Sequence, residues 1–324
     1  MDNTLKLVGK LDLSEVSVSI VILTYNRVAL LEKLLYSLLA IDQLGLEIIV
    51  VDNHSEDGTD KLLNDQFFRC VYIRTEKNIG AVARNFGIRR ARGNIIVCID
   101  DDVFGINKEA INIIEKKFYD NPTIAAINFK VLDYYTGEIC NWVHHCKVED
   151  FSEGTFKTYE ITEGAVAFRK SALDGTNLYP DYFFISHEGP DLAFRLMDKG
   201  YDVIYIGEVV VQHCHSNLGR KSWTTYYYDS RNQFWLAVRN LPFFYALKYL
   251  TRGLISTLVY SLRDGYFRYW LKAIKDGVGG LPVVWKDRKI VSKCTINVIE
   301  QIDKMRPPLW YLIKKRLFHK GMRL

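Results

Sequence analysis

The sequence predicts an α/β fold in which helices flank a mostly parallel sheet, followed by a helical C-terminal extension. In the first 120 residues, short apolar runs alternate with segments of helical spacing. This alternation is typical of parallel strands that are joined by helical crossovers. From about residue 222 onward, long aromatic-rich segments with helical character replace the alternation. We therefore expect one sheet-based unit and a helical unit after it.

Continuous apolar runs identify the strands of the first half, because a strand buried on both faces has no polar alternation. We expect strands at residues 18–23, 47–51, 70–73 and 94–99, and helices at 29–39, 58–64, 79–91 and 108–118. The middle of the chain is mixed, with strands expected at 123–131, 165–169, 203–206 and 209–211 and a helix at 190–199.

Composition and charge narrow the class of protein. About half of the 324 residues are hydrophobic, which is typical of a globular chain. The six cysteines follow no framework and the N-terminus has no signal-peptide pattern, so we expect a cytoplasmic protein with free thiols. The segment 241–262 is interrupted by Pro242, Lys248 and Arg252, which favours an amphipathic element over a membrane span.

The C-terminal tail is basic and contains Trp and Leu. Such a tail suggests an anionic surface, either membrane or nucleic acid, although a solvated helix face has the same pattern. We expect peripheral contact with the inner face of the cell membrane and no nucleic-acid partner. The cationic residues are Lys286, Arg288, Lys289, Lys293, Lys304, Arg306, Lys314, Lys315, Arg316, Lys320 and Arg323.

Three consecutive carboxylates, Asp100, Asp101 and Asp102, follow the apolar run 94–99. Like charges this close repel one another, so a cation is needed to keep them ionised side by side. A hard divalent metal that bridges a phosphate-bearing substrate meets this need, whereas the simpler interpretation is a solvated acidic turn.

Polar clusters also end the earlier strands, with Thr24-Tyr25-Asn26 after the first and Asp52-Asn53 after the second. Ligands of parallel sheets bind outside the carboxyl ends of the strands. This convergence favours a binding site over an acidic turn. The glycine-rich turns of dinucleotide-binding and P-loop proteins are absent from the sequence, so a cation is expected to hold the phosphates.

These motifs resemble those of family 2 glycosyltransferases, which have the GT-A fold with its Rossmann-like sheet. The resemblance covers roughly residues 16–216. Its motifs are Thr24-Tyr25-Asn26-Arg27, the segment from Val51 to Thr59, the segment from Asn78 to Asn85, and Asp100-Asp101-Asp102, which resembles the Asp-x-Asp motif of that family.

The resemblance implies a nucleotide-sugar site at these positions. Tyr25 and Asp52 would contact the base, and Asp100 would approach the ribose or the sugar. Asp102 would bind Mg²⁺ or Mn²⁺, with His213 completing the metal shell and His215 in reserve. The remaining members of the expected nucleotide-binding set are Thr24, Gly80, Arg84, Asn85 and Asp101.

Two alternatives apply to individual members of this set. Arg84 and Asn85 could instead fix their helix to neighbouring loops, and Asp101 could face away from the ligand as a structural residue.

The acceptor side is expected in the segment from Phe183 to Leu192, which resembles the family segment that carries the catalytic base. Many members have an acidic Glu-Asp pair there, whereas this sequence has Glu188-Gly189 and lacks the second acid. Glu188 is the preferred base and Asp191 the alternative. Asp191 also lies near a predicted helix start, where the helix dipole stabilises a carboxylate.

The resemblance implies an inverting, metal-dependent glycosyltransferase. It would move a sugar from a nucleotide-sugar donor to a glycan, lipid-linked or protein acceptor, in the synthesis of cell-surface polysaccharides or glycoconjugates. The alternatives are a catalytically impaired nucleotide-sugar-binding or scaffold module and a nucleotidyltransferase. We expect an N-terminal extension (1–15), a catalytic domain (16–221, with a donor half 16–120 and an acceptor half 121–221) and a helical, basic region (222–324) that could also form an oligomer interface.

Overall fold

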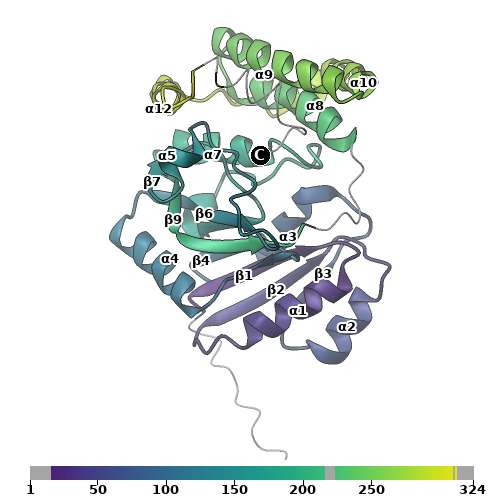
Figure 1. Cartoon of the computed structure of the whole chain (residues 1–324), viewed down its shortest axis with the longest axis vertical. Helices are drawn as coiled ribbons and strands as arrows, with labels where there is room; N and C mark the ends of the chain where they lie inside the picture. Colours follow the sequence, from purple (N-terminus) through teal and green to yellow (C-terminus); the bar gives the residue numbers. More distant parts are fainter. Residues whose placement is uncertain (1–15, 216–222, 309–310, 312–324) are drawn as a thin grey trace, which may run out of the picture.

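The computed structural model of the chain describes residues 16–215, 223–308 and 311. The predicted extension 1–15 and the basic residues from Lys314 onward therefore lie outside the described residues. The described chain forms a mixed, mostly parallel sheet in the order β3-β2-β1-β4-β8-β6-β9-β5, with β7 paired to β9 (Figure 1). The strands are β1 Val18–Thr24, β2 Leu46–Asp52, β3 Val71–Arg74, β4 Ile95–Asp100, β5 Val103–Phe104, β6 Ile124–Asp133, β7 Thr155–Lys157, β8 Ala165–Arg169 and β9 Asp202–His213.

Strands β3, β2, β1 and β4 are parallel, as predicted. Alternate side chains of β1 pack into two different hydrophobic cores. Val18, Ile20 and Ile22 pack with α1 and α2, while Val21 faces α3. The helices of this half are α1 Val28–Leu39, α2 Thr59–Gln66, η1 Gly80–Ala83, α3 Arg84–Arg90 and α4 Lys108–Asp120.

The helix predicted at 79–91 is divided into a 3-10 turn, η1, and the α-helix α3. Gly80, at the start of η1, has φ +77°, a backbone conformation that side chains with a Cβ rarely adopt. A Cβ at this position would lie 1.9 Å from the carbonyl oxygen of Phe184. The close approach of the Phe184 segment therefore requires a glycine here.

Strand β8 is antiparallel to both of its neighbours, β4 and β6. Its first residue, Ala165, pairs with Ile99 near the carboxyl end of β4. Because β8 runs against β4, the residues just before β8 lie at the edge where β4 ends. Residues 162–164 are thereby brought to the predicted ligand-binding edge.

The two short strands predicted at 203–206 and 209–211 form one strand, β9. Its pairing with β6 shifts register between Phe129, opposite Ile206, and Lys130, opposite Val210. The polar and glycine residues that suggested a break thus belong to a bulge, which interrupts the pairing without ending the strand.

Further helices cover the second half of the sheet and form a layer beyond it (Figure 1). They are α5 Val148–Phe151, α6 Lys170–Leu173, α7 Glu188–Asp198, α8 Trp223–Asn240, α9 Phe243–Arg263, α10 Phe267–Gly279, α11 Leu281–Lys286 and α12 Lys293–Asp303. Trp235, Leu236 and Leu241 of this layer share a hydrophobic core with Leu192 and Leu196 of α7. The predicted helical C-terminal region is confirmed, and none of the described helices is long and apolar enough to cross a membrane.

Candidate active site

The predicted polar residues meet at one edge of the sheet. Leu23 pairs with Asp100, and Thr24 pairs with Asp52, so the ends of β1, β2 and β4 are level. The loops after β1 and β2 are also bonded to each other. The Asn26 N–H donates to Ser55 Oγ (2.9 Å), and the Glu56 N–H donates to Asn26 Oδ1 (2.8 Å).

Two arginines compensate the three aspartates. Arg27 Nη1 lies 3.0 Å from Asp101 Oδ1 and also forms an ion pair with Asp102, while Arg84 pairs with Asp100. The sequence suggested that a metal would be the compensating cation, but here two arginines from two other segments already pair with the three acids. A metal is therefore not needed to hold these acids together. The argument for a metal site depends on whether suitable ligand atoms lie close to one another.

Thr24 and Asp101 face each other within the protein. Thr24 Oγ1 donates to Asp101 Oδ2 (2.7 Å), and the two residues are 1% exposed. Burial raises the pKa of Asp101 to about 7, although Arg27 acts in the opposite direction. This arrangement corrects the expected ligand contacts of both residues, because neither side chain reaches the surface of the site. It matches the structural alternative for Asp101.

Asp102 and His213 are brought together from the turn after β4 and from the end of β9. Asp102 Oδ1 is buried, accepts no hydrogen bond from the described residues, and lies 3.3 Å from His213 Nε2. Burial raises the pKa of Asp102, but His213 and Arg27 outweigh it, so the pKa lies below its usual value. A carboxylate oxygen that accepts no hydrogen bond and a neighbouring imidazole nitrogen are two ligand atoms that Mn²⁺ can bind. The two residues that the resemblance selected as metal ligands therefore fit a metal.

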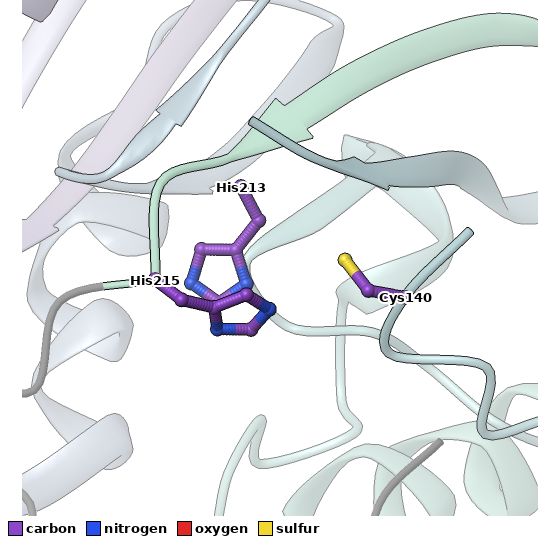
Figure 2. Close-up of side chains that lie close together, drawn as sticks. All are labelled: Cys140, His213 and His215. Carbon is purple, nitrogen blue, oxygen red and sulfur yellow. The ribbon is translucent and has the colours of Figure 1, made fainter. Parts of the chain in front are cut away.

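His213 also belongs to a second group of potential ligands. The ligand atoms of Cys140, His213 and His215 lie within 4.8 Å of one another, and Figure 2 shows the two rings together with the cysteine on a facing segment. Asn141 Nδ2 lies 2.6 Å from His213 Nδ1, which leaves Nε2 directed at Asp102. His215, the reserve candidate, is thus near the metal pair, and the cysteine adds a soft donor that favours Zn²⁺.

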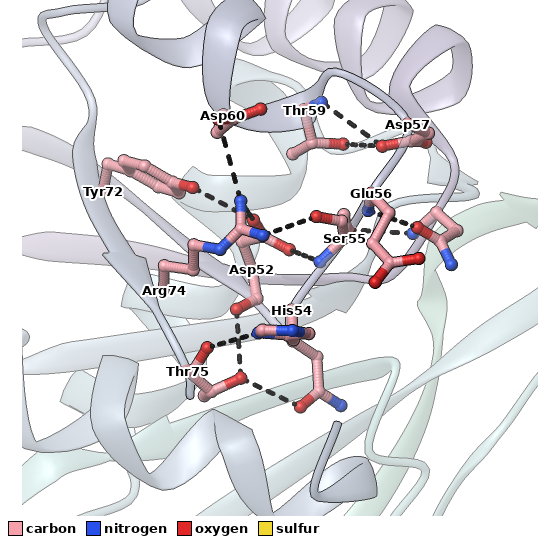
Figure 3. Close-up of polar contacts among 12 residues, drawn as sticks. Asp52, His54, Ser55, Glu56, Asp57, Thr59, Asp60, Tyr72, Arg74 and Thr75 are labelled. Atoms are coloured by element: carbon pink, nitrogen blue, oxygen red, sulfur yellow. Dashed lines mark hydrogen bonds and ion pairs between the residues drawn. The ribbon is translucent and has the colours of Figure 1, made fainter. Parts of the chain in front are cut away.

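Asp52 is enclosed by the loop that follows it and by side chains of β3 (Figure 3). It is 0% exposed, and its Oδ1 accepts the Ser55 N–H (2.7 Å). Its Oδ2 accepts the Tyr72 hydroxyl (3.0 Å) and lies 3.5 Å from Arg74 Nη1. In this arrangement Asp52 shapes the loop after β2, and direct contact with a base would require Tyr72 or Arg74 to move.

The other expected nucleotide-binding residues divide into exposed and buried ones. Tyr25 is 38% exposed and free to stack on a ligand. Arg84 is buried against Asp100, whose side chain is 30% exposed. Asn85 is buried with both amide atoms bonded to the backbone of Tyr179, at 2.8 and 3.1 Å. Asn85 thus fixes α3 to a loop, as its alternative interpretation had it.

The two candidate bases occupy very different environments at the start of α7. Asp191 is 0% exposed and accepts hydrogen bonds from Asn240 Nδ2 and from Arg195 Nε (3.3 Å), while Arg239 Nε forms an ion pair with it at 3.0 Å. Its carboxylate is fully used in joining α7 to α8. This environment removes Asp191 as the alternative base and gives it a structural role.

Glu188 is the first residue of α7 and is 3% exposed. Its Oε2 is buried and has no hydrogen-bond partner in the part of the chain that the structure describes. Burial and the nearby Glu163 carboxylate raise the pKa of Glu188 well above its usual range. No motif in the sequence selects Glu163, because it stands alone before β8. Only the antiparallel placement of β8 brings it next to α7.

The fold compares with several solved glycosyltransferases. S. aureus TarS 1-349, in a structure with UDP-GlcNAc, has a TM-score of 0.60 at 15% identity, covering 89% of this chain and 90% of TarS. The mannosyltransferase PcManGT from Pyrobaculum calidifontis, in complex with GDP-Man and Mn²⁺, has a TM-score of 0.55 at 17% identity, covering 95% and 88% of the two chains. The fold is that of the GT-A glycosyltransferases.

Sequence comparison gives the family. Residues 19–174 match the model of glycosyl transferase family 2. The O-antigen chain rhamnosyltransferase RfbN of Salmonella typhimurium is 22% identical over 222 residues, which cover 65% of this chain and 70% of RfbN. An uncharacterized protein of Haemophilus influenzae is 29% identical over 147 residues, 42% and 77% of the two chains. Residues 19–174 thus form a family 2 glycosyltransferase domain, as the motifs predicted.

Proposed function

We propose that the protein transfers a sugar, with inversion, from a nucleoside diphosphate sugar to an acceptor hydroxyl, using Mn²⁺ or Mg²⁺. The observation that carries the proposal is the Asp102–His213 pair, in which a buried carboxylate oxygen without a hydrogen bond faces an imidazole nitrogen at 3.3 Å. A metal held there would stabilise the charge of the departing diphosphate. Solved proteins of the same fold bind UDP-GlcNAc, and GDP-Man with Mn²⁺, which supports a nucleotide-sugar donor.

Different residues of the chain would bind the donor and accept the proton. Tyr25 stacks on the base, and Asp100, partly exposed and oriented by Arg84, contacts the ribose or the sugar. A carboxylate beside the start of α7 removes the proton from the acceptor hydroxyl as the new bond forms. The likeness to an O-antigen rhamnosyltransferase supports a glycan or lipid-linked acceptor in the synthesis of a cell-surface polysaccharide, with a protein acceptor as the third option.

A donor screen tests the proposal and its main alternative. UDP-, GDP- and dTDP-sugars are added with Mn²⁺, and both the melting temperature and the release of nucleoside diphosphate are measured. We expect one donor to raise the melting temperature, because a ligand that binds only the native state stabilises it. We also expect slow turnover of that donor. Binding without any turnover would favour the catalytically impaired module, and neither binding nor turnover would refute the proposal.

The metal itself is tested by titration. Mn²⁺ or Mg²⁺ should restore turnover after chelation, and Cys140→Ser should leave this restoration unchanged. If Cys140→Ser instead abolishes metal-dependent turnover, the metal lies in the Cys140–His213–His215 group rather than at the Asp102–His213 pair.

We further propose that α9 contacts an anionic membrane surface. The outer face of this helix has an exposed apolar stripe at helical spacing, formed by Phe244, Leu247, Ile255, Val259 and Leu262. The exposed Lys248 lies beside the stripe. Aromatic and aliphatic side chains next to a cation suit the boundary between acyl chains and anionic headgroups.

The membrane contact predicts a loss of vesicle binding in the double variant Phe244→Ser/Leu247→Ser. Fully burying one such side chain stabilises by about 1.5–3 kcal/mol, so binding to vesicles that contain an anionic phospholipid should fall by roughly tenfold or more. Co-sedimentation measures it. Leu44→Ser is the matched control, since Leu44 is 93% exposed in a loop after α1. Equal binding of all three proteins would refute the contact.

A further inference from the structure

The second acid of the family motif, which this sequence lacks at position 189, has a substitute nearby in space. A Cβ built on Gly189 would lie 2.3 Å from Glu163 Oε1 and 2.4 Å from the carbonyl oxygen of Ile161. No side chain fits at residue 189 while the 161–163 segment is in place. The Glu163 carboxylate itself occupies the space into which a side chain at 189 would begin to project.

The same segment also contacts the donor side of the site. A Cβ on Gly164 would lie 2.6 Å from Asp100 Oδ2, and the Asp100 N–H faces the carbonyl oxygen of Gly164 at 3.4 Å. Glu163 therefore stands between Asp100, at the end of β4, and Glu188, at the start of α7. A base for the transfer has to reach the acceptor hydroxyl where it approaches the sugar, and a carboxylate on a segment that contacts both Asp100 and the start of α7 suits that task.

Glu188 differs from Glu163 in its access to solvent. Glu188 is 3% exposed, and its Oε2 is buried without a hydrogen-bond partner, whereas Glu163 is only half-buried. Two carboxylates this close do not both ionise readily, so one keeps a proton that the other has lost. The more deeply buried Glu188 is the one that keeps it.

We propose that Glu163 is the general base of the transfer and replaces the acid absent at position 189, with the protonated Glu188 behind it. This assignment rests on the proposed function. In the step, the acceptor oxygen forms a bond to the anomeric carbon while the bond from that carbon to the diphosphate breaks. The acceptor proton passes to the Glu163 carboxylate, and the electron pair leaves with the nucleoside diphosphate.

The charges around Glu163 suit this task. Glu163 interacts with Arg84 of α3, with Asp100 of β4 and with Glu160 of its own segment, while Asp229 of α8 acts on Glu188. Burial raises the pKa of Glu163 to about 7, although Arg84 lowers it. A base is most effective when its pKa is near the working pH.

The test compares Glu163→Gln, Glu163→Asp and Glu188→Gln as full-length proteins. The probe is the nucleotide sugar that raises the melting temperature, and the rate measured is release of nucleoside diphosphate with water as acceptor. We expect Glu163→Gln to lower the rate by about 10²–10⁴-fold, the usual contribution of a general base. Its thermal shift with the nucleotide should persist. Glu163→Asp should keep more activity than Glu163→Gln, because it keeps a carboxylate.

The pH profile separates a base from a structural residue. A base acts only when deprotonated, so the wild-type rate should rise as the pH increases through about 7, the pKa of Glu163. This rise should disappear in Glu163→Gln. Glu188→Gln retains a neutral side chain of the same shape and should lose at least tenfold less activity than Glu163→Gln. Glu208→Gln is the matched control on the exposed edge of β9, where Glu208 is 51% exposed and pairs with Lys117.

A Glu163→Gln variant that keeps the rate within about threefold, or keeps the pH-dependent rise, would overturn the assignment but leave the proposed function intact. A larger loss in Glu188→Gln than in Glu163→Gln would make Glu188 the base and overturn it as well. If the wild-type protein turns over no nucleotide sugar, the proposed function fails, and the assignment fails with it.

Discussion

Asp102→Ala is expected to lower turnover of the donor by about 10³-fold or more and to abolish the effect of Mn²⁺ on the melting temperature. The metal that we place at Asp102 and His213 would contribute several kcal/mol of charge stabilisation as the diphosphate leaves. His213 by itself is one neutral ligand, and it would bind a divalent ion weakly. Turnover and thermal shifts, each with and without Mn²⁺, measure the effect.

The stability of this variant distinguishes a metal ligand from a structural acid. Removing the sole partner of a buried charge costs about 3–5 kcal/mol, but Arg27 keeps Asp101 at 3.0 Å. We therefore expect a loss of unfolding free energy below that range. Asp120→Asn is the control, because Asp120 is the last residue of α4 and its side chain is 49% exposed. Turnover within about threefold of wild type in Asp102→Ala would show that Asp102 holds no catalytic metal.

Asp191→Ala is expected to be the most destabilising single change in the site region, lowering the unfolding free energy by about 3–5 kcal/mol. The substitution leaves Arg195 and Arg239 with reduced compensation inside the protein, and an unpaired buried charge costs this much. It also removes the bond from Asn240 that joins α7 to α8. Urea unfolding, followed by far-UV circular dichroism, measures the loss.

Asp287→Ala is the matched control for this prediction, because Asp287 pairs with the same Arg239 at 3.2 Å but is 53% exposed. Exposed ion pairs contribute about 0–1 kcal/mol, so this variant should unfold close to wild type. Similar losses in the two variants would mean that Arg239, rather than the buried Asp191 network, determines the stability of this interface.

The donor side of the site could be predicted because its residues follow strands that are visible in the sequence. The apolar runs 18–23, 47–51 and 94–99 fix where each strand stops, and parallel pairing makes those ends level. The residues at the ends are thereby near one another whatever their partners are. The position of Asp100 and Asp102 at this edge was predicted in this way, and their roles stay a prediction.

The partners of these residues could not be predicted, since they come from distant segments. Arg27 and Asp102 are 75 positions apart, and the bond between Asn85 and Tyr179 spans 94. No local pattern indicates which of several cations will reach a carboxylate. The sequence for this reason suggested a metal as the compensating charge and a base contact for Asp52, whereas the folded chain supplies Arg27, Arg84, Tyr72 and Arg74.

The sequence by itself determined the fold class, the family and the carboxyl edge of the sheet, because these depend on apolar periodicity and on residues adjacent in the chain. The tertiary structure alone decided which acid is buried in the α7–α8 interface and which lies beside Glu163. Asp191 and Glu188 are three residues apart on one helix, yet only packing distinguishes them. The antiparallel insertion of β8 placed Glu163 beside Gly189, and such a contact follows from strand order rather than from any local pattern.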